Sequence, residues 1–114
     1  MRCWSRGRAR PPLRDMPDPV RLEATVRGVV QGVGFRYFVM REAHRRKLTG
    51  WVANAHDGSV RVVAEGSAPE IAAFRAALED GPPSAVVDRV SAVEMPATGS
   101  FGEFSVRSGG HSGD

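Results

Sequence analysis

The chain has 114 residues, of which 41% are hydrophobic and 25% are charged, and it contains one cysteine. This size and composition are typical of one soluble globular domain, and no apolar run approaches the ~18 residues that a membrane-spanning helix needs. Because the single Cys3 can form neither an internal disulfide nor a cysteine-based metal site, and no apolar signal segment stands at the N-terminus, we expect a cytoplasmic protein.

The net charge of +3 is distributed unevenly along the chain. Five arginines and one aspartate give residues 1–15 a net charge of +4, so the rest of the chain carries −1. We therefore expect residues 1–19 to be a disordered basic leader, of which residues 1–15 are absent from the native protein if translation starts at Met16. The polar segment 108–114 predicts a disordered tail, which leaves one domain at 20–107 whose charge does not favour nucleic acid as a partner.

Three strands and a helix are predicted in the first half of this domain. Residues 21–27 alternate apolar with polar side chains, which is the pattern of a half-buried strand. A glycine-rich stretch at 28–34 follows, and apolar side chains then recur at helical spacing, which predicts a helix over 35–47. Residues 50–54 and 60–65 predict two short strands that are antiparallel neighbours.

Turn and capping signals organise the second half. The Asp57-Gly58 step favours a tight hairpin turn between the two short strands. A capping box over Ser67–Glu70 predicts the start of a second helix, and the Asp-Gly-Pro-Pro sequence at 80–83 ends it. Residues 86–94 alternate again, and the side chains expected to share one face of this strand are Val86, Asp88, Val90, Ala92 and Glu94.

A last strand is predicted within 101–107. The order β-α-β-β-α-β with an extra C-terminal strand matches the ferredoxin-like (split βαβ) fold. This is an α+β two-layer sandwich in which two helices cover one face of an antiparallel sheet. Because such a fold hosts enzymes, metal carriers and RNA-binding modules, the function has to be inferred from a site.

The glycine-rich stretch has the properties of an anion site. Gly28, Gly32 and Gly34 allow backbone conformations in which consecutive N–H groups point into one concavity. The stretch leads into a helix N-terminus, whose unpaired N–H groups and dipole favour an anion at the same place. Arg36 stands where its guanidinium can grip two phosphate oxygens. The glycines alone are equally compatible with a simple turn, and Arg36 favours the anion site.

Other catalytic and cofactor sites find little support. The stretch lacks the Gly-Lys-Ser/Thr ending of a nucleoside-triphosphate loop, and Tyr37 takes the place of the third glycine of a dinucleotide fingerprint. Neither the histidines nor the carboxylates form a converging group; these residues are His44, His56, His111, Glu42, Glu65, Glu79 and Asp88. We therefore expect neither a metal ion nor a cofactor.

Two segments resemble the signatures of a known family. Residues 28–36 read Gly-Val-Val-Gln-Gly-Val-Gly-Phe-Arg and residues 50–54 read Gly-Trp-Val-Ala-Asn, which closely resembles the acylphosphatase family, with similarity over 21–107. The resemblance implies hydrolysis of small acyl phosphates to a carboxylate and inorganic phosphate. It also implies two catalytic residues, Arg36 to bind the phosphate and Asn54 to position the water that attacks phosphorus.

The phosphate ligands follow from the same resemblance. The implied ligands are backbone N–H groups of the glycine-rich stretch together with one guanidinium, namely Gln31, Gly32, Val33, Gly34, Phe35 and Arg36. One position departs from the family, because Val29 stands where a basic residue is usual. We expect the departure to weaken attraction of the substrate without abolishing the reaction, since an acyl phosphate has a good leaving group and needs mainly positioning and electrostatic stabilisation.

Two other functions stay open at this point. One is a non-catalytic module that senses anions or binds nucleic acid through the basic N-terminal arm, although the sheet-face motifs of RNA-binding modules are missing. The other is a detached copy of the acylphosphatase-like domain of larger carbamoyl-phosphate-processing proteins. We favour a monomeric enzyme that has a small-molecule acyl phosphate as its partner, releases inorganic phosphate and does not bind a membrane.

Overall fold

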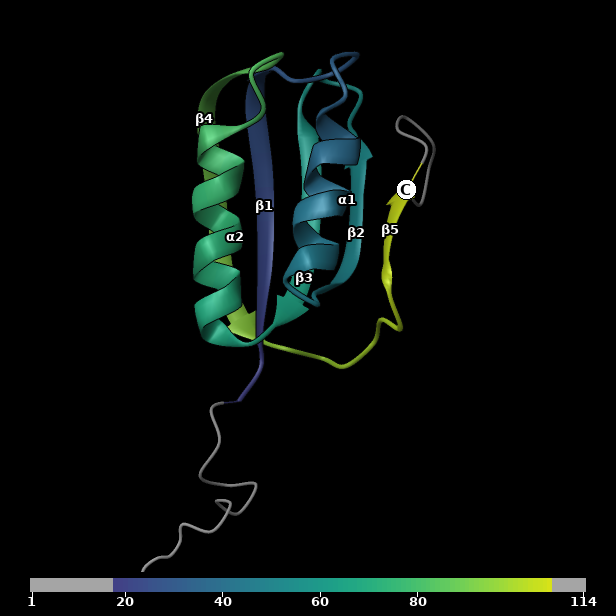
Figure 1. Cartoon of the computed structure of the whole chain (residues 1–114), viewed down its shortest axis with the longest axis vertical. Coiled ribbons are helices and arrows are strands. Elements are labelled where there is room, and N and C mark those ends of the chain that lie inside the picture. The colour runs from purple at the N-terminus through teal and green to yellow at the C-terminus, as the bar shows by residue number, and fades with distance from the viewer. Residues whose placement is uncertain (1–17, 108–114) are drawn as a thin grey trace, which may run out of the picture.

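The computed structural model of the chain describes residues 18–107. Apart from its last two residues the predicted leader lies outside the described residues, and so does the predicted tail. Within 18–107 no helix is long and apolar enough to cross a membrane. Figure 1 shows the elements, which in chain order are β1 (Val20–Val29), α1 (Phe35–Arg45), β2 (Thr49–Asn54), β3 (Val60–Gly66), α2 (Ala68–Asp80), β4 (Val86–Pro96) and β5 (Phe104–Arg107).

Both helices cover the same face of one sheet whose strand order is β4-β1-β3-β2-β5 (Figure 1). The pairs β1–β4, β1–β3 and β2–β3 are antiparallel, whereas β5 runs parallel to β2. The ferredoxin-like α+β fold is confirmed, but the expectation of a wholly antiparallel sheet is wrong at this edge. The chain leaves β4 at the end of the sheet where β2 begins and crosses to the opposite edge, so β5 has to start there and run alongside β2.

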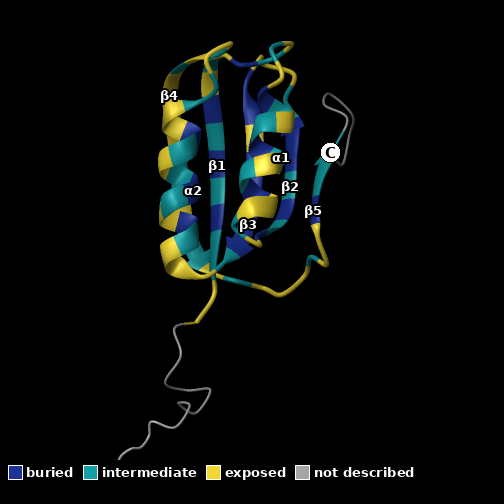
Figure 2. Ribbon diagram, viewed as in Figure 1, coloured by how far each residue is buried: buried dark blue, intermediate teal, exposed yellow. Residues whose placement is uncertain are grey.

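The core lies between the helices and the sheet, as the buried positions in Figure 2 show. The apolar side of β1, with Leu22, Ala24 and Val26, is buried as the alternation predicts. Helix α1 ends two residues before the predicted position because Lys47 adopts a left-handed φ of 58°. The N–H of Leu48 then turns back to the carbonyl of Ala43 at 2.9 Å, which closes the helix end.

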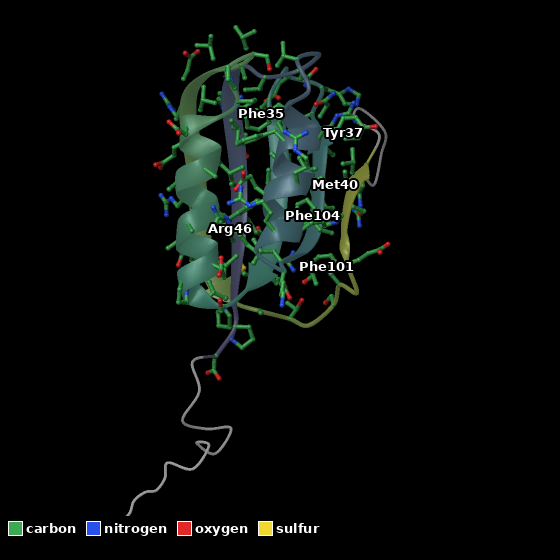
Figure 3. All side chains as sticks on the ribbon, in the orientation of Figure 1. Phe35, Tyr37, Met40, Arg46, Phe101 and Phe104 are labelled. Atoms are coloured by element: carbon green, nitrogen blue, oxygen red, sulfur yellow. The ribbon has the colours of Figure 1, made fainter. Side chains whose placement is uncertain are left out.

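The predicted capping box does not form the hydrogen bond expected from the side chain of its first residue, Ser67. Ser67 does occupy the N-cap position of α2, but its side chain makes no capping hydrogen bond. Pro69 removes one of the N–H groups that the hydroxyl would accept from. The carboxylate of Glu70 lies instead 3.5 Å from the guanidinium of Arg46, which stands between the two helices (Figure 3).

A β-bulge changes which face of β4 is buried. The register of β1 against β4 shifts between Arg27 and Gly28, and Asp88 is the extra residue. The shift turns Val87, in place of Val86, toward the core, so the predicted alternation of this strand is wrong at its start. The side chains of β4 that pack against the core are Val87, Val90 and Ala92.

A buried carboxylate fixes the segment that carries the chain from β4 to β5. Glu65 of β3 is only 4% exposed, and it accepts hydrogen bonds from the N–H and hydroxyl of Thr98, at 3.0 and 2.8 Å, and from the N–H of Gly99 at 2.9 Å. The guanidinium of Arg21 adds a contact at 3.0 Å. Burial by itself raises the pKa of Glu65, but these hydrogen bonds outweigh it and lower the pKa to about 2.

Replacing this carboxylate, in Glu65→Gln, is expected to cost about 2 kcal/mol of unfolding free energy near neutral pH, because charge-assisted hydrogen bonds are lost. The folded pKa is depressed, so this stabilisation is present above the ordinary value of 4.5 and disappears as pH falls toward about 2. Urea unfolding at about pH 7 and about pH 3 measures both effects. If the native and variant proteins differed in unfolding free energy by the same amount at both pH values, the lowered pKa of Glu65 would be contradicted.

Candidate active site

The segment between β1 and α1, residues 30–34, forms the centre of the candidate site. Gly32 and Gly34 adopt left-handed φ values of 74° and 79°, and Gly34 is the N-cap of α1. The first amide of the helix region with a backbone partner is that of Phe38, which donates to the carbonyl of Gly34 at 3.1 Å. In the described part of the chain, the N–H groups of residues 32–36 donate to no backbone carbonyl. These unpaired donors stand at the positive end of the helix dipole and suit an anion.

The phosphate loop, as we call residues 30–34, is anchored at both ends. Val30 is 1% exposed, and so is Phe35, whose ring lies in the core at the upper end of α1 in Figure 3. Phe35 can therefore offer only its N–H to a ligand. At the base of the loop, Gly28 has a φ of 136°, and a Cβ there would lie 2.1 Å from the carbonyl oxygen of Val86. The bulge thus requires glycine at this position.

Arg36 is held by the C-terminal end of β5. One nitrogen of its guanidinium donates to the carbonyl of Arg107 at 3.0 Å. Arg107 is itself fixed, because it pairs with Ala53 across the parallel strands and its guanidinium lies 4.8 Å from the centre of the Trp51 ring. A guanidinium carries five N–H donors, so the contact leaves most of them for a phosphate. No local pattern in the sequence indicates this support, which joins residues far apart in the chain.

Asn54 ends β2, directly after the residue that pairs with Arg107, so β5 and β2 bring the two predicted catalytic residues to the same end of the sheet. Its Oδ1 atom is buried, and no group among the described residues donates a hydrogen bond to it. A buried carbonyl oxygen without a donor costs about 1–3 kcal/mol. Such an acceptor is suited to receive an O–H from a water molecule at the site.

The prediction for Gln31 concerns its backbone N–H, and its side chain is engaged elsewhere. Its Nε2 atom donates to the carbonyls of Ala55 and Ser59, at 2.7 and 2.9 Å. These carbonyls belong to the turn between β2 and β3, which follows Asn54 directly. The structure thus ties the phosphate loop to this turn. Only the N–H of Gln31 stays a candidate for phosphate binding.

The turn between β2 and β3 is braced from outside by Asp57. One carboxylate oxygen accepts the N–H and hydroxyl of Ser59, at 3.0 and 2.6 Å, and the other accepts from Arg27 at 3.0 Å. The hydrogen bond from the Ser59 hydroxyl is the main reason that the pKa of Asp57 lies well below its usual range, with the Ser59 N–H and Arg27 adding to it. The turn therefore has a defined shape before any ligand binds.

Two further expectations concern Val29 and metal ligands. Val29 is 58% exposed and pairs with Val86 at the end of β1, directly before the phosphate loop. Among residues 18–107, no group of three or more His, Cys, Asp or Glu side chains is arranged to hold a metal ion. His44 lies on α1 with its Nε2 atom 3.1 Å from the carbonyl of Phe104, and His111 lies outside the described residues.

Comparison with known proteins assigns a family to this arrangement. A model of the acylphosphatase family matches residues 22–106. An acylphosphatase of Mannheimia succiniciproducens is 56% identical over 81 residues, which cover 71% of this chain and 90% of the relative. One from Burkholderia mallei is 53% identical over 79 residues, covering 69% of this chain and 81% of the relative.

Solved structures agree with the sequence comparison. The crystal structure of acylphosphatase from Bacillus subtilis superimposes with a TM-score of 0.75 at 41% identity, covering 77% of this chain and 98% of that one. Full-length HypF, solved in its phosphate- and nucleotide-bound form, gives a TM-score of 0.74 at 30% identity. That match covers 82% of this chain and 12% of HypF, so it concerns one part of a much larger protein.

The two glycines that shape the loop are expected to respond differently to alanine. Gly32→Ala places a Cβ in open space, so only its left-handed backbone should lower the free energy of unfolding, by about 1–2 kcal/mol. Gly28→Ala should cost more, because its Cβ also meets the backbone of β4. Urea unfolding of both variants tests the difference, and equal losses would show that the bulge does not constrain the base of the loop.

Proposed function

The chain belongs to the acylphosphatase family, and we propose that it hydrolyses acyl phosphates by attack of water at phosphorus in the loop between β1 and α1. One observation carries the proposal: unpaired N–H groups of the phosphate loop and the guanidinium of Arg36 stand at the same helix start. Fixed donors of this kind bind a phosphate dianion and stabilise the charge that spreads over its oxygens during transfer.

The substrate's chemistry explains why so few side chains are needed. An acyl phosphate is a mixed anhydride, and its carboxylate leaves readily without strong protonation. The protein therefore contributes positioning and electrostatic stabilisation, and no covalent intermediate is required. The proposal involves no metal ion and no cofactor, so activity should persist in the presence of a chelator.

Asn54 is proposed to hold the attacking water. Its buried Oδ1 accepts one O–H of the water, and its NH2 group can donate to a second oxygen at the site. The water oxygen forms a bond to phosphorus in line with the bond that joins phosphorus to the acyl oxygen. That bond breaks, its electron pair leaves with the carboxylate, and the proton of the water passes to a phosphate oxygen. The products are a carboxylate and dihydrogen phosphate.

Arg36→Ala and Asn54→Ala should each reduce kcat at least about 100-fold, as loss of one preorganised donor does in other enzymes. The assay follows the disappearance of a simple aromatic acyl phosphate in the presence of a chelator. Arg41→Ala is the matched control, since it removes an exposed arginine from the same helix and should leave kcat unchanged.

Three outcomes would contradict the proposal. The first is that the native chain does not consume acyl phosphate. The second is that Arg36→Ala keeps full activity, and the third is that Arg41→Ala lowers kcat as much as Arg36→Ala does. An inactive native chain that still binds inorganic phosphate through Arg36 would instead support the non-catalytic anion-binding module.

Val29→Arg is expected to lower KM for an acyl phosphate, because a cation at the exposed end of β1 attracts the substrate dianion. The effect should shrink as ionic strength rises, since exposed charges are screened. Steady-state kinetics at low and at high salt measure both. An unchanged KM at low salt would remove this position from substrate attraction.

A further inference from the structure

Gln31 carries a role that phosphate binding does not explain. A primary amide has two N–H donors, and Nε2 of Gln31 uses them on the carbonyls of Ala55 and Ser59, at 2.7 and 2.9 Å. The atom that remains, Oε1, is an acceptor and would repel the oxygens of a phosphate. The side chain of Gln31 is therefore unsuited to contact the substrate's phosphate.

The two carbonyls are the points at which the β2–β3 turn closes on itself. The oxygen of Ser59 also accepts the N–H of Ala55 at 2.8 Å, and the oxygen of Ala55 also accepts the N–H of Gly58 at 3.2 Å. Each carbonyl has two lone pairs, so the amide of Gln31 completes the bonding of both. Ser59 is 2% exposed, which keeps solvent from competing at its end of the turn.

The carbonyls of Ala55 and Ser59 lie next to the end of β2, where Asn54 stands. Ala55 directly follows Asn54, and Ser59 directly precedes Val60, the residue that pairs with Asn54 across the two strands. Asn54 thus leaves the sheet at the point where Gln31 holds the turn. The backbone of Gln31, in turn, is the start of the segment that contributes N–H groups to the phosphate.

We infer that Gln31 is a positioning residue: its amide locks the turn that follows Asn54 onto the phosphate loop and so sets the position of the Asn54-held water relative to phosphorus. The inference rests on the proposed function. Its consequence is that Gln31 acts on the rate of the chemical step through Asn54 and hardly affects phosphate affinity.

The first test is a double-mutant cycle with Gln31→Leu and Asn54→Ala, which isolates the coupling between two residues. Gln31→Leu should reduce kcat about tenfold or more in the native background, since misplacement by about 1 Å is costly in catalysis. In the Asn54→Ala background the same change should alter kcat by less than about twofold, because no positioned water is left to disturb. The dissociation constant of inorganic phosphate should stay nearly unchanged.

The matched control is Ser84→Ala. The hydroxyl of Ser84 donates to the carbonyl of Val33 at 2.8 Å and is therefore a second side-chain tie to the phosphate loop, from the segment that precedes the edge strand β4. Any loss of kcat in Ser84→Ala should be the same with and without Asn54.

A second readout is independent of activity. The chain contains one glutamine and one asparagine, so an ¹⁵N-labelled sample gives two pairs of side-chain NH2 signals, and the pair lost in Gln31→Leu and the pair lost in Asn54→Ala assign them. The signal of Gln31 should exchange slowly with solvent. The signal of Asn54 should shift or broaden in Gln31→Leu and stay in place in Ser84→Ala. If Gln31→Leu does not fold, Gln31→Glu keeps the size of the side chain, removes the donors and is measured instead.

The results separate this inference from the proposed function. Additive effects of Gln31→Leu and Asn54→Ala, an unmoved Asn54 signal, or weaker phosphate binding with unchanged kcat would each overturn the positioning role while leaving an active acylphosphatase. A native chain without activity would overturn both.

Discussion

The unpaired backbone N–H groups between β1 and α1 impose the constraint on which the site depends. Donors of this kind stay unpaired only if the chain turns into the helix without closing its own hydrogen bonds, and the left-handed Gly32 and Gly34 permit that turn. The turn needs a firm base, which the bulge at Gly28 and the buried Val30 provide. Because no side chain supplies these donors, the loop depends on its backbone shape, which packing and glycines have to hold.

Arg36 and Asn54 depend on the far edge of the sheet. The crossing from β4 to β5 is held by Glu65 through hydrogen bonds to Thr98 and Gly99, and β5 can then pair in parallel with β2. Its last described residue, Arg107, presents a carbonyl to Arg36 next to the strand that ends in Asn54. A network on the opposite side of the molecule from the phosphate loop thus helps to place Arg36, for which we propose a role in phosphate binding.

The sequence predicts the parts of this account that arise from local patterns. Alternation identified β1 and helical spacing identified α1. The glycines with Arg36 predicted an anion site at a helix start, which stays a prediction. The sequence could not show the parallel pairing of β5, because strand direction depends on where a long crossing ends, nor the bulge at Asp88, which shifts a register without a local signal. Gln31 is the clearest case: the sequence predicted a role only for its backbone N–H, and the distant carbonyls of Ala55 and Ser59 show where its side-chain donors go.

The central claim is that water attacks phosphorus within the loop that joins β1 to α1. Hydrolysis of an acyl phosphate in ¹⁸O-labelled water, followed by mass analysis of both products, tests this directly because the label marks the atom that was attacked. The account predicts that the label enters inorganic phosphate and that the carboxylate stays unlabelled. Label in the carboxylate would show attack at the acyl carbon and would contradict the assigned roles of the phosphate loop, Arg36 and Asn54.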